Sequence, residues 1–455
     1  MLGKGNPVGF AISETPKSGV GGFTRITHVF QESDNTFKSM TKPTGLVSER
    51  GAEQVSDAPA TAETPPPTQS SQVTFTVYQG PPLDTIRSLV ASHFLVKDAF
   101  IDQYGIPTIQ VAPEPPREKF RTLLKELAQH NLIGAIRGAG DTLTVRVFPK
   151  PQRKGSRKTL NLALFFATVA TVLAAGYFNW SNADLFTVLV EPSSVLTKAS
   201  LFAVGLLAII GLHEFGHKAA TNHHGLDATF PYFIPGPPPV GTFGALISLR
   251  GPPENRDQLF DLGLSGPVVG FIVTVVIAIF SLLLSTTVSP ATAQQLITGG
   301  ATQDLGFCLP LVGATPNVSC EAPLLLIVGR ILMPATAQGS LLFPNQELWF
   351  AAHIGALLTF LNIVPAWQLD GGHVSRAMFG PSGHRTATLI GLVILFVSGY
   401  LVFAFFLLIM MNLTRRGFAG VEPLDDVSPV SNSRKLLYLL AIVMLLLTFF
   451  PSPIL

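Results

Sequence analysis

Long apolar stretches after residue 158 constrain the fold of this chain more than any other feature. They run over residues 160–178, 199–218, 262–285, 349–369, 387–411 and 436–451. The longer ones reach the roughly 20 residues that a helix needs to cross a bilayer. Only 13% of the residues are charged, against about a quarter in soluble proteins. We therefore expect an α-helical polytopic membrane protein, embedded in a lipid bilayer, with about six transmembrane helices.

The chain before these stretches divides into two parts. Residues 1–72 are rich in Ser, Thr, Pro and Gly and show no apolar periodicity, which predicts a disordered tail. Residues 73–149 carry strand-like and helix-like patterns, which predict a small soluble α/β accessory domain without a catalytic constellation. Its expected elements are Val73–Tyr78, Leu83–Phe94, Ala99–Ile101, Thr108–Val111, a helix opened by Pro115 and Pro116, and a strand through Leu143, Val145 and Val147.

A basic linker, residues 150–158, leads into the predicted membrane domain, residues 159–455. Its charges are Lys150, Arg153, Lys154, Arg157 and Lys158. By the positive-inside rule these charges hold the soluble domain in the cytoplasm. Six spans then place the connection 286–348 outside, where Cys308 and Cys320 could form a disulfide in an oxidising compartment. The same count places Arg415, Arg416, Arg434 and Lys435 outside, against the rule.

The net charge of +2 is too small to indicate a nucleic-acid partner.

The residues His213-Glu214-Phe215-Gly216-His217 close the second apolar stretch. Residues four apart share a helix face, so the two imidazoles can bind one metal ion. Glu214 lies on the same turn and is the candidate general base. Two neutral imidazoles and a nearby carboxylate are what a hydrolytic zinc site requires. Such groups are costly in lipid, which favours a functional site over a chance motif.

A second motif runs from Asn362 to Gly372 at the end of the fourth stretch. Asp370 needs a partner in this apolar setting, and a metal held by two imidazoles provides one. Zinc hydrolases use three protein ligands and keep a fourth position for water, so Asp370 is the expected third ligand. We expect Pro365 to kink the helix and the two glycines after Asp370 to allow a sharp turn. Asn362 is the candidate catalytic donor to a substrate carbonyl or oxyanion.

Between the motifs lies an apolar segment, residues 230–249, with too many prolines and glycines to span as a helix. Irregular backbone at membrane depth is tolerated only when it is buried in protein or lines a cavity. We therefore expect a re-entrant hairpin beside the metal, with a strand over Gly241–Leu249; an ordinary interfacial loop is the alternative. Further on, Ser265-Gly266-Pro267 and Gly270 allow close approach of a neighbouring helix, with packing and a direct role both open.

Together these residues resemble the site-2 protease family of intramembrane zinc metalloproteases. The resemblance rests on His213-Glu214-Phe215-Gly216-His217 and on Asn362-x-x-Pro365-x-x-x-Leu369-Asp370-Gly371, and it covers residues 160–412. Pro231-Tyr232-Phe233-Ile234-Pro235 and Thr242-Phe243-Gly244-Ala245 resemble the branch with a soluble N-terminal domain. The resemblance implies Zn²⁺ as cofactor. It also implies cleavage of single-span membrane proteins within or near their transmembrane segments, as in regulated intramembrane proteolysis.

The expected location is a prokaryotic plasma membrane. A plastid membrane is the second choice, because plastid members carry Gly-Asn-Leu-Arg where this chain has Gly134-Ala135-Ile136-Arg137. Two other functions stay open. One is a catalytically silent member that acts as a membrane chaperone, against which an intact Glu214 argues. The other is a transporter, for which the sequence offers no internal repeat. The substrate and the oligomeric state are not fixed by the sequence.

Overall fold

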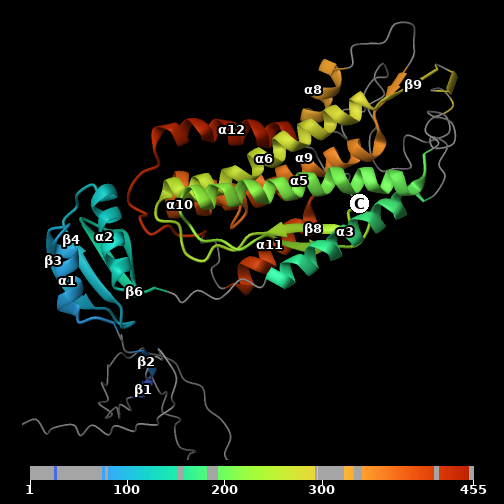
Figure 1. Ribbon diagram of the computed structural model, residues 1–455. Helices are drawn as coiled ribbons and strands as arrows, with labels where there is room; N and C mark the ends of the chain where they lie inside the picture. The colour runs from blue at the N-terminus through green and yellow to red at the C-terminus, as the bar shows by residue number, and fades with distance from the viewer. Residues whose placement is uncertain are drawn as a thin grey trace, which may run out of the picture.

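The computed structural model describes residues 80–150, 158–181, 193–289, 322–332, 341–414 and 420–449, with short pieces at 25–27, 74–76, 291–292 and 295. A small sheet-containing domain and a mostly helical body lie end to end (Figure 1). Of the predicted tail, only the short strand β1 (Arg25–Thr27), paired with β2 (Thr74–Thr76), is described. Most of the basic linker, Cys308, Cys320, Arg415 and Arg416 lie outside the described residues.

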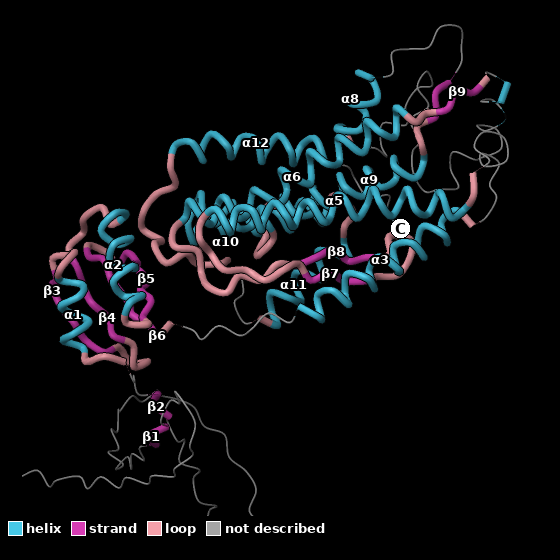
Figure 2. Tube along the Cα trace, viewed as in Figure 1, coloured by secondary structure: helices cyan, strands magenta, loops and turns pink. Residues whose placement is uncertain are grey.

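The N-terminal domain, predicted to be soluble and called the soluble domain below, is an antiparallel sheet with two helices packed against it (Figure 2). Its elements are α1 (Leu83–Ala91), β3 (Val96–Ile101), β4 (Pro107–Val111), α2 (Arg117–Gln129), β5 (Leu132–Ala139) and β6 (Thr142–Pro149), and its strand order is β3-β4-β6-β5. Helix α2 begins directly after the two prolines and buries Phe120, Leu123 and Leu127, as the helical spacing predicts. The predicted α/β elements between residues 83 and 149 are confirmed.

One strand of this sheet, β5, was not predicted. Its sequence contains Gly134 and Gly138, which weaken a strand pattern because glycine offers no side chain to pack. At Gly134 the reason is a close approach, since a Cβ there would lie 2.9 Å from the Leu127 side chain. Strand β5 stands at one edge of the sheet, so one side of its backbone is free to bond a segment from elsewhere.

The helical body is built around α5 and α6. Its helices are α3 (Lys158–Trp180), α5 (Val195–His223), α6 (Arg256–Leu283), α8 (Pro323–Leu332), α9 (Gln346–Ile363), α10 (Asp370–Val397), α11 (Leu401–Leu413) and α12 (Asn432–Thr448), and a short ladder of β9 (Thr286–Val288) and β10 (Leu341–Phe343) lies between α6 and α9. Helix α5 packs against α3, α6 and α9, and α6 also packs against α10. Among the described residues, α3, α5 and α6 are long and apolar enough to cross a membrane. Of the six expected spans, these three are candidate membrane-spanning helices by length and composition, and the count of six stays a prediction.

The fifth predicted span, residues 387–411, is not one helix. Helix α10, which is already kinked at Gly380 (φ +69°), ends at Val397; Gly399 has a φ of +84°, and α11 begins at Leu401. A left-handed residue cannot continue a right-handed helix, and glycine adopts that conformation without strain. The prediction failed because apolar composition continues through this turn while the backbone does not.

With the fifth predicted span broken, the start of α12 lies on the side of the helical body opposite to the one predicted from six spans. Arg434 Nε donates to Asp261 of α6 at 2.8 Å, and the neighbouring Asp257 is ion-paired at 3.0 Å with Arg117 of the soluble domain. The beginning of α12 therefore lies on the same side as the soluble domain (Figure 1). The prediction that placed Arg434 and Lys435 on the opposite side is wrong, and their conflict with the positive-inside rule disappears.

The segment 230–249 forms a hairpin, as predicted, from β7 (Tyr232–Pro235) and β8 (Thr242–Leu246). Three polar side chains of α3 hold its carbonyl groups: Asn161 bonds Phe230 O at 2.9 Å, Thr171 bonds Gly241 O at 2.7 Å, and Asn179 bonds Pro239 O at 2.8 Å. In an otherwise apolar helix these side chains satisfy backbone groups that lipid would leave unpaired. The hairpin is thereby fixed alongside α3. Its depth in a bilayer stays a prediction.

Candidate metal centre

The two motif histidines and Asp370 point their donor atoms at one position. His213 Nε2 and His217 Nε2 lie 3.1 Å apart on one face of α5. Asp370, the first residue of α10, places its Oδ2 3.3 Å from each of these nitrogens. The donor atoms of His213, Glu214 and His217 all lie within 4.8 Å of one another. The helix spacing and the second motif therefore meet in space as predicted.

These distances fit a zinc ion. Ligands about 2.0–2.1 Å from Zn²⁺ at tetrahedral angles stand roughly 3.3–3.4 Å from one another. The three separations here are 3.1, 3.3 and 3.3 Å. Two imidazoles and one carboxylate leave a fourth tetrahedral position without a protein ligand, which is the arrangement of hydrolytic rather than structural zinc sites.

Helix α6 forms the wall behind the histidines. His217 Nδ1 lies 2.8 Å from the carbonyl oxygen of Leu262, so this nitrogen carries the proton and Nε2 presents its lone pair to the metal position. A Cβ at Gly266 would lie 2.1 Å from His217 Nε2, and one at Gly270 would lie 2.9 Å from His213 Nδ1. The small residues predicted for close approach therefore leave room for the imidazoles. The carbonyl of Leu262 gave no signal in the sequence, because backbone acceptors carry none.

A tight turn between α9 and α10 presents Asp370. Helix α9 ends at Ile363, and α10 begins with Asp370 itself, five residues after Pro365. A Cβ at Gly371 would lie 2.0 Å from Ile363 O, and one at Gly372 would lie 2.3 Å from Trp367 O. The sharp turn is confirmed. The glycines are needed because the start of α10 packs directly against the backbone of residues 363–367. Neither glycine has a positive φ, so space and not backbone conformation requires them.

The remaining candidates are Glu214 and Asn362. Glu214 is 6% exposed and lies on the same helical turn as both histidines. Asn362 is half-buried on the last turn of α9. None of the hydrogen bonds described for these helices joins Asn362 to the histidines or to Asp370, so its role stays a prediction.

Comparison with known proteins places this site in a family. A model of peptidase family M50 matches residues 201–405, a span that contains all five candidate residues. The probable zinc metalloprotease EGY2, chloroplastic, of Oryza sativa subsp. indica is 29% identical over 221 residues, which are 48% of this chain and 36% of that protein. The probable zinc metalloprotease EGY1, chloroplastic, of Arabidopsis thaliana is 27% identical over 255 residues, 55% of this chain and 42% of that protein.

A third relative, the probable zinc metallopeptidase EGY3, chloroplastic, of Arabidopsis thaliana, is 22% identical over 304 residues, 64% of this chain and 48% of that protein. The chain thus spans less than half the length of each of these relatives. No solved structure matches it. The family match covers the helices that carry His213, His217 and Asp370, and the relatives are named as zinc metalloproteases. Over residues 201–405 the chain matches peptidase family M50, and together with the zinc metalloproteases among its relatives this supports a protein of the site-2 protease family.

Proposed function

We propose that this chain is an intramembrane zinc endopeptidase that cleaves membrane-anchored proteins within or near their transmembrane segments. One observation carries the proposal: His213, His217 and a buried Glu214 lie on α5, a helix of membrane-spanning length and apolarity, and Asp370 of α10 meets the two histidines there with zinc-like separations. Soluble proteases have no need of such helices. The same observation weighs against a transporter, because the polar groups converge on one position and do not line a path.

The residues divide the work between binding and proton transfer. His213, His217 and Asp370 would hold the metal. Zinc bound there would supply a Lewis acid that polarises a peptide carbonyl and lowers the pKa of water. Glu214 accepts the proton of the attacking water and passes one to the leaving amine. Asn362 is proposed to steady the oxygen of the scissile carbonyl, a contribution that typically amounts to a 10²–10³-fold factor in kcat.

The β7–β8 hairpin is the proposed receiver of substrate. A helical substrate hides its carbonyl groups in i to i+4 hydrogen bonds, so it must unwind before cleavage. Strand addition to the hairpin would supply new partners for that backbone. The hairpin packs in the same apolar cluster as Ile210, one turn before His213. Its stem is tied to α5 by Lys218, which donates to Ala228 O at 2.8 Å.

The proposed location follows the relatives. Those named above are all chloroplastic, which favours a plastid membrane over the prokaryotic plasma membrane expected from the sequence. The proposed partners are single-span membrane proteins in the same bilayer. By the positive-inside rule, the basic cluster that includes Lys150 would keep the soluble domain on the side of the membrane where the chain is made.

The test is co-expression with candidate single-span substrates. Wild type should release a cleavage product that Glu214→Gln does not, because the amide is nearly isosteric but cannot accept a proton at neutral pH. Zinc content of the purified variant is the control and should match wild type. Equal product from Glu214→Gln would remove Glu214 from the mechanism. Wild type that holds zinc yet cleaves no candidate, while it still changes their folding or abundance, would favour the chaperone alternative.

A further inference from the structure

A loop of the helical body adds itself to the free edge of the soluble domain's sheet. Ile136 N of β5 donates to Leu424 O at 2.8 Å, and the Leu424 side chain is part of the soluble domain's buried core. On its other side the same loop bonds the residues just before α6, where Leu424 N donates to Pro253 O at 2.9 Å and Asp425 N to Glu254 O at 2.7 Å. The loop is thus held between the soluble domain and the start of α6.

The next residue, Asp426, ties this loop to α10. Arg376 bonds both of its carboxylate oxygens, Nη1 to Oδ1 at 2.9 Å and Nη2 to Oδ2 at 2.7 Å. The Arg376 side chain is only 2% exposed. Arg256, the first residue of α6, adds a third bond from Nε at 3.0 Å. Burial opposes ionisation of Asp426, but the hydrogen bonds and charge of Arg376, together with Arg256, outweigh it and hold the pKa of Asp426 below its usual value.

Both helices that meet at Asp426 also shape the metal centre. Arg376 follows Asp370 on α10 by six residues, about 9 Å along the helix axis. Helix α6 supplies Leu262 O and the space at Gly266 that orient His217. The backbones of the two helices are in contact where Gly263 of α6 meets Asp370 of α10, since a Cβ at Gly263 would lie 2.6 Å from Asp370 O. One carboxylate therefore fixes the relative placement of the two helices that flank the metal position.

We propose that Arg376 and Asp426 are positioning residues for the metal centre, through which the docked soluble domain sets the placement of α10 and hence of Asp370. This proposal rests on the proposed zinc site. A bidentate arginine–carboxylate pair suits the task because its planar geometry allows little sliding. Removal of the loop from β5 would leave Asp426 held only by the helical body and so loosen its hold on α10, which makes the accessory domain a means of controlling metal affinity.

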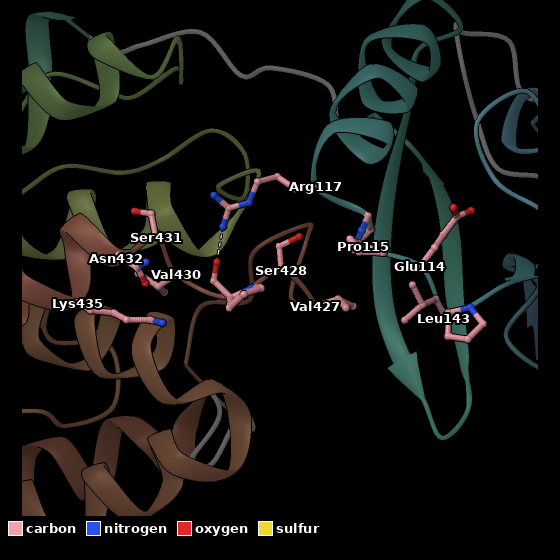
Figure 3. Close-up of a pocket in the computed structure, with 13 residues that line it drawn as sticks. Glu114, Pro115, Arg117, Leu143, Val427, Ser428, Val430, Ser431, Asn432 and Lys435 are labelled. Atoms are coloured by element: carbon pink, nitrogen blue, oxygen red, sulfur yellow. Dashed lines mark hydrogen bonds between the residues drawn. The ribbon is translucent and has the colours of Figure 1, made fainter.

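The junction depends on a small set of contacts. Arg117 donates to Pro429 O across it. Figure 3 shows Arg117 beside a pocket of about 760 Å³ whose lining includes Pro115, Ser428 and Lys435. Arg137 of β5 supplies another contact, with Nη1 donating to Leu424 O at 2.8 Å and Nη2 lying 3.2 Å from Glu422. Substitution of Arg137 therefore weakens the contact between the two parts without changing any residue of the helical body.

The experiment measures metal affinity by chelator competition on the purified full chain, and the visible spectrum at saturating Co²⁺. Asp426→Asn should raise the zinc dissociation constant about tenfold or more, as loss of supporting contacts does in other zinc sites, and should change the Co²⁺ spectrum. Arg137→Ala should do the same to a smaller extent. The matched control is Arg146→Ala in the same domain, which loses a 2.8 Å ion pair with Asp102 away from the junction and should leave both readouts unchanged.

Asp370→Ala separates this proposal from the one it rests on. If wild type binds no zinc, or Asp370→Ala keeps it, the zinc site itself fails. If zinc binding is lost in Asp370→Ala while Asp426→Asn and Arg137→Ala match wild type in affinity and spectrum, only the positioning role is overturned. Should Asp426→Asn not fold, Arg137→Ala and the double variant Arg376→Met/Asp426→Leu, which leaves no unpaired charge at Arg376, decide the question by the same readouts.

Discussion

At the residue scale, a single methyl group should decide whether His217 can bind metal. A Cβ at Gly266 would lie 2.1 Å from His217 Nε2, the atom that faces the metal position. Because both helices are packed on their other sides, the imidazole cannot move aside without loss of its bond to Leu262 O. Gly266→Ala should therefore abolish stoichiometric zinc binding in protein that still inserts and elutes as wild type. Metal analysis of the purified variant measures this.

Gly211→Ala is the matched control. Gly211 precedes His213 by two residues on α5, and a Cβ there meets nothing within 4 Å. Alanine is also the better helix former by about 1 kcal/mol. This variant should hold zinc like wild type. Full zinc content in Gly266→Ala would show that α6 stands farther from His217 than the structure places it.

The convergence of the candidate ligands could be predicted from the sequence, because residue type and helical spacing determine which side chains can share a metal. The helix period alone pairs His213 with His217. Asp370 is predicted as their partner because a carboxylate in an apolar setting requires one. The wall of the site could not be predicted to the same depth. Leu262 acts through its carbonyl and Gly266 through the absence of a side chain, and neither property marks a residue as functional in a sequence.

At the scale of elements, the hairpin offers a test of substrate reception. Gly244 lies in β8 with a φ of +97°, and a Cβ there would meet nothing within 4 Å. Any other residue would strain the backbone, at a cost of about 1–3 kcal/mol, without a steric clash. Gly244→Ala should reshape β8 and lower the rate of substrate cleavage severalfold. Zinc content should stay that of wild type, because the hairpin supplies no ligand.

Gly251→Ala provides the comparison for this element. Gly251 lies in the loop that follows the hairpin, has the same open space around its Cα, and does not have a left-handed φ. Alanine should be accepted there with cleavage unchanged. If Gly244→Ala cleaves substrate at the wild-type rate, the shape of β8 is not what receives the substrate.

Elements were predicted well where periodicity is strong and poorly where it is interrupted. Helix α2 shows its buried residues at helical spacing, and its bounds follow the two prolines. Strand β5 was missed because its glycines hide the alternation. The stretch 387–411 failed in the opposite way, since its apolar side chains run on through a turn that only the φ of Gly399 reveals. Apolar composition indicates which segments avoid water, but it does not indicate where the backbone turns.

At the scale of the whole molecule, the turn at Gly399 determines on which side the last connection lies. One unbroken fifth span would carry residues 412–435 to the face opposite the soluble domain. The structure instead bonds Leu424 to β5 and Arg434 to Asp261. The proposed coupling between the soluble domain and α10 requires this arrangement, because Asp426 can reach Arg376 and β5 together only on the soluble-domain side.

Cysteine labelling tests the arrangement directly. In a background with Cys308→Ser and Cys320→Ser, single cysteines replace the exposed residues Ser92 of the soluble domain, Ser433 of α12 and Ser289 of the connection after α6. An impermeant maleimide added to sealed membranes with the soluble domain inside should label Ser289→Cys only, and all three after lysis. Labelling of Ser433→Cys in sealed membranes, with Ser92→Cys protected, would restore the unbroken fifth span. Asp426 and β5 would then lie on opposite sides of the bilayer, and the positioning role of the soluble domain would fall with the topology.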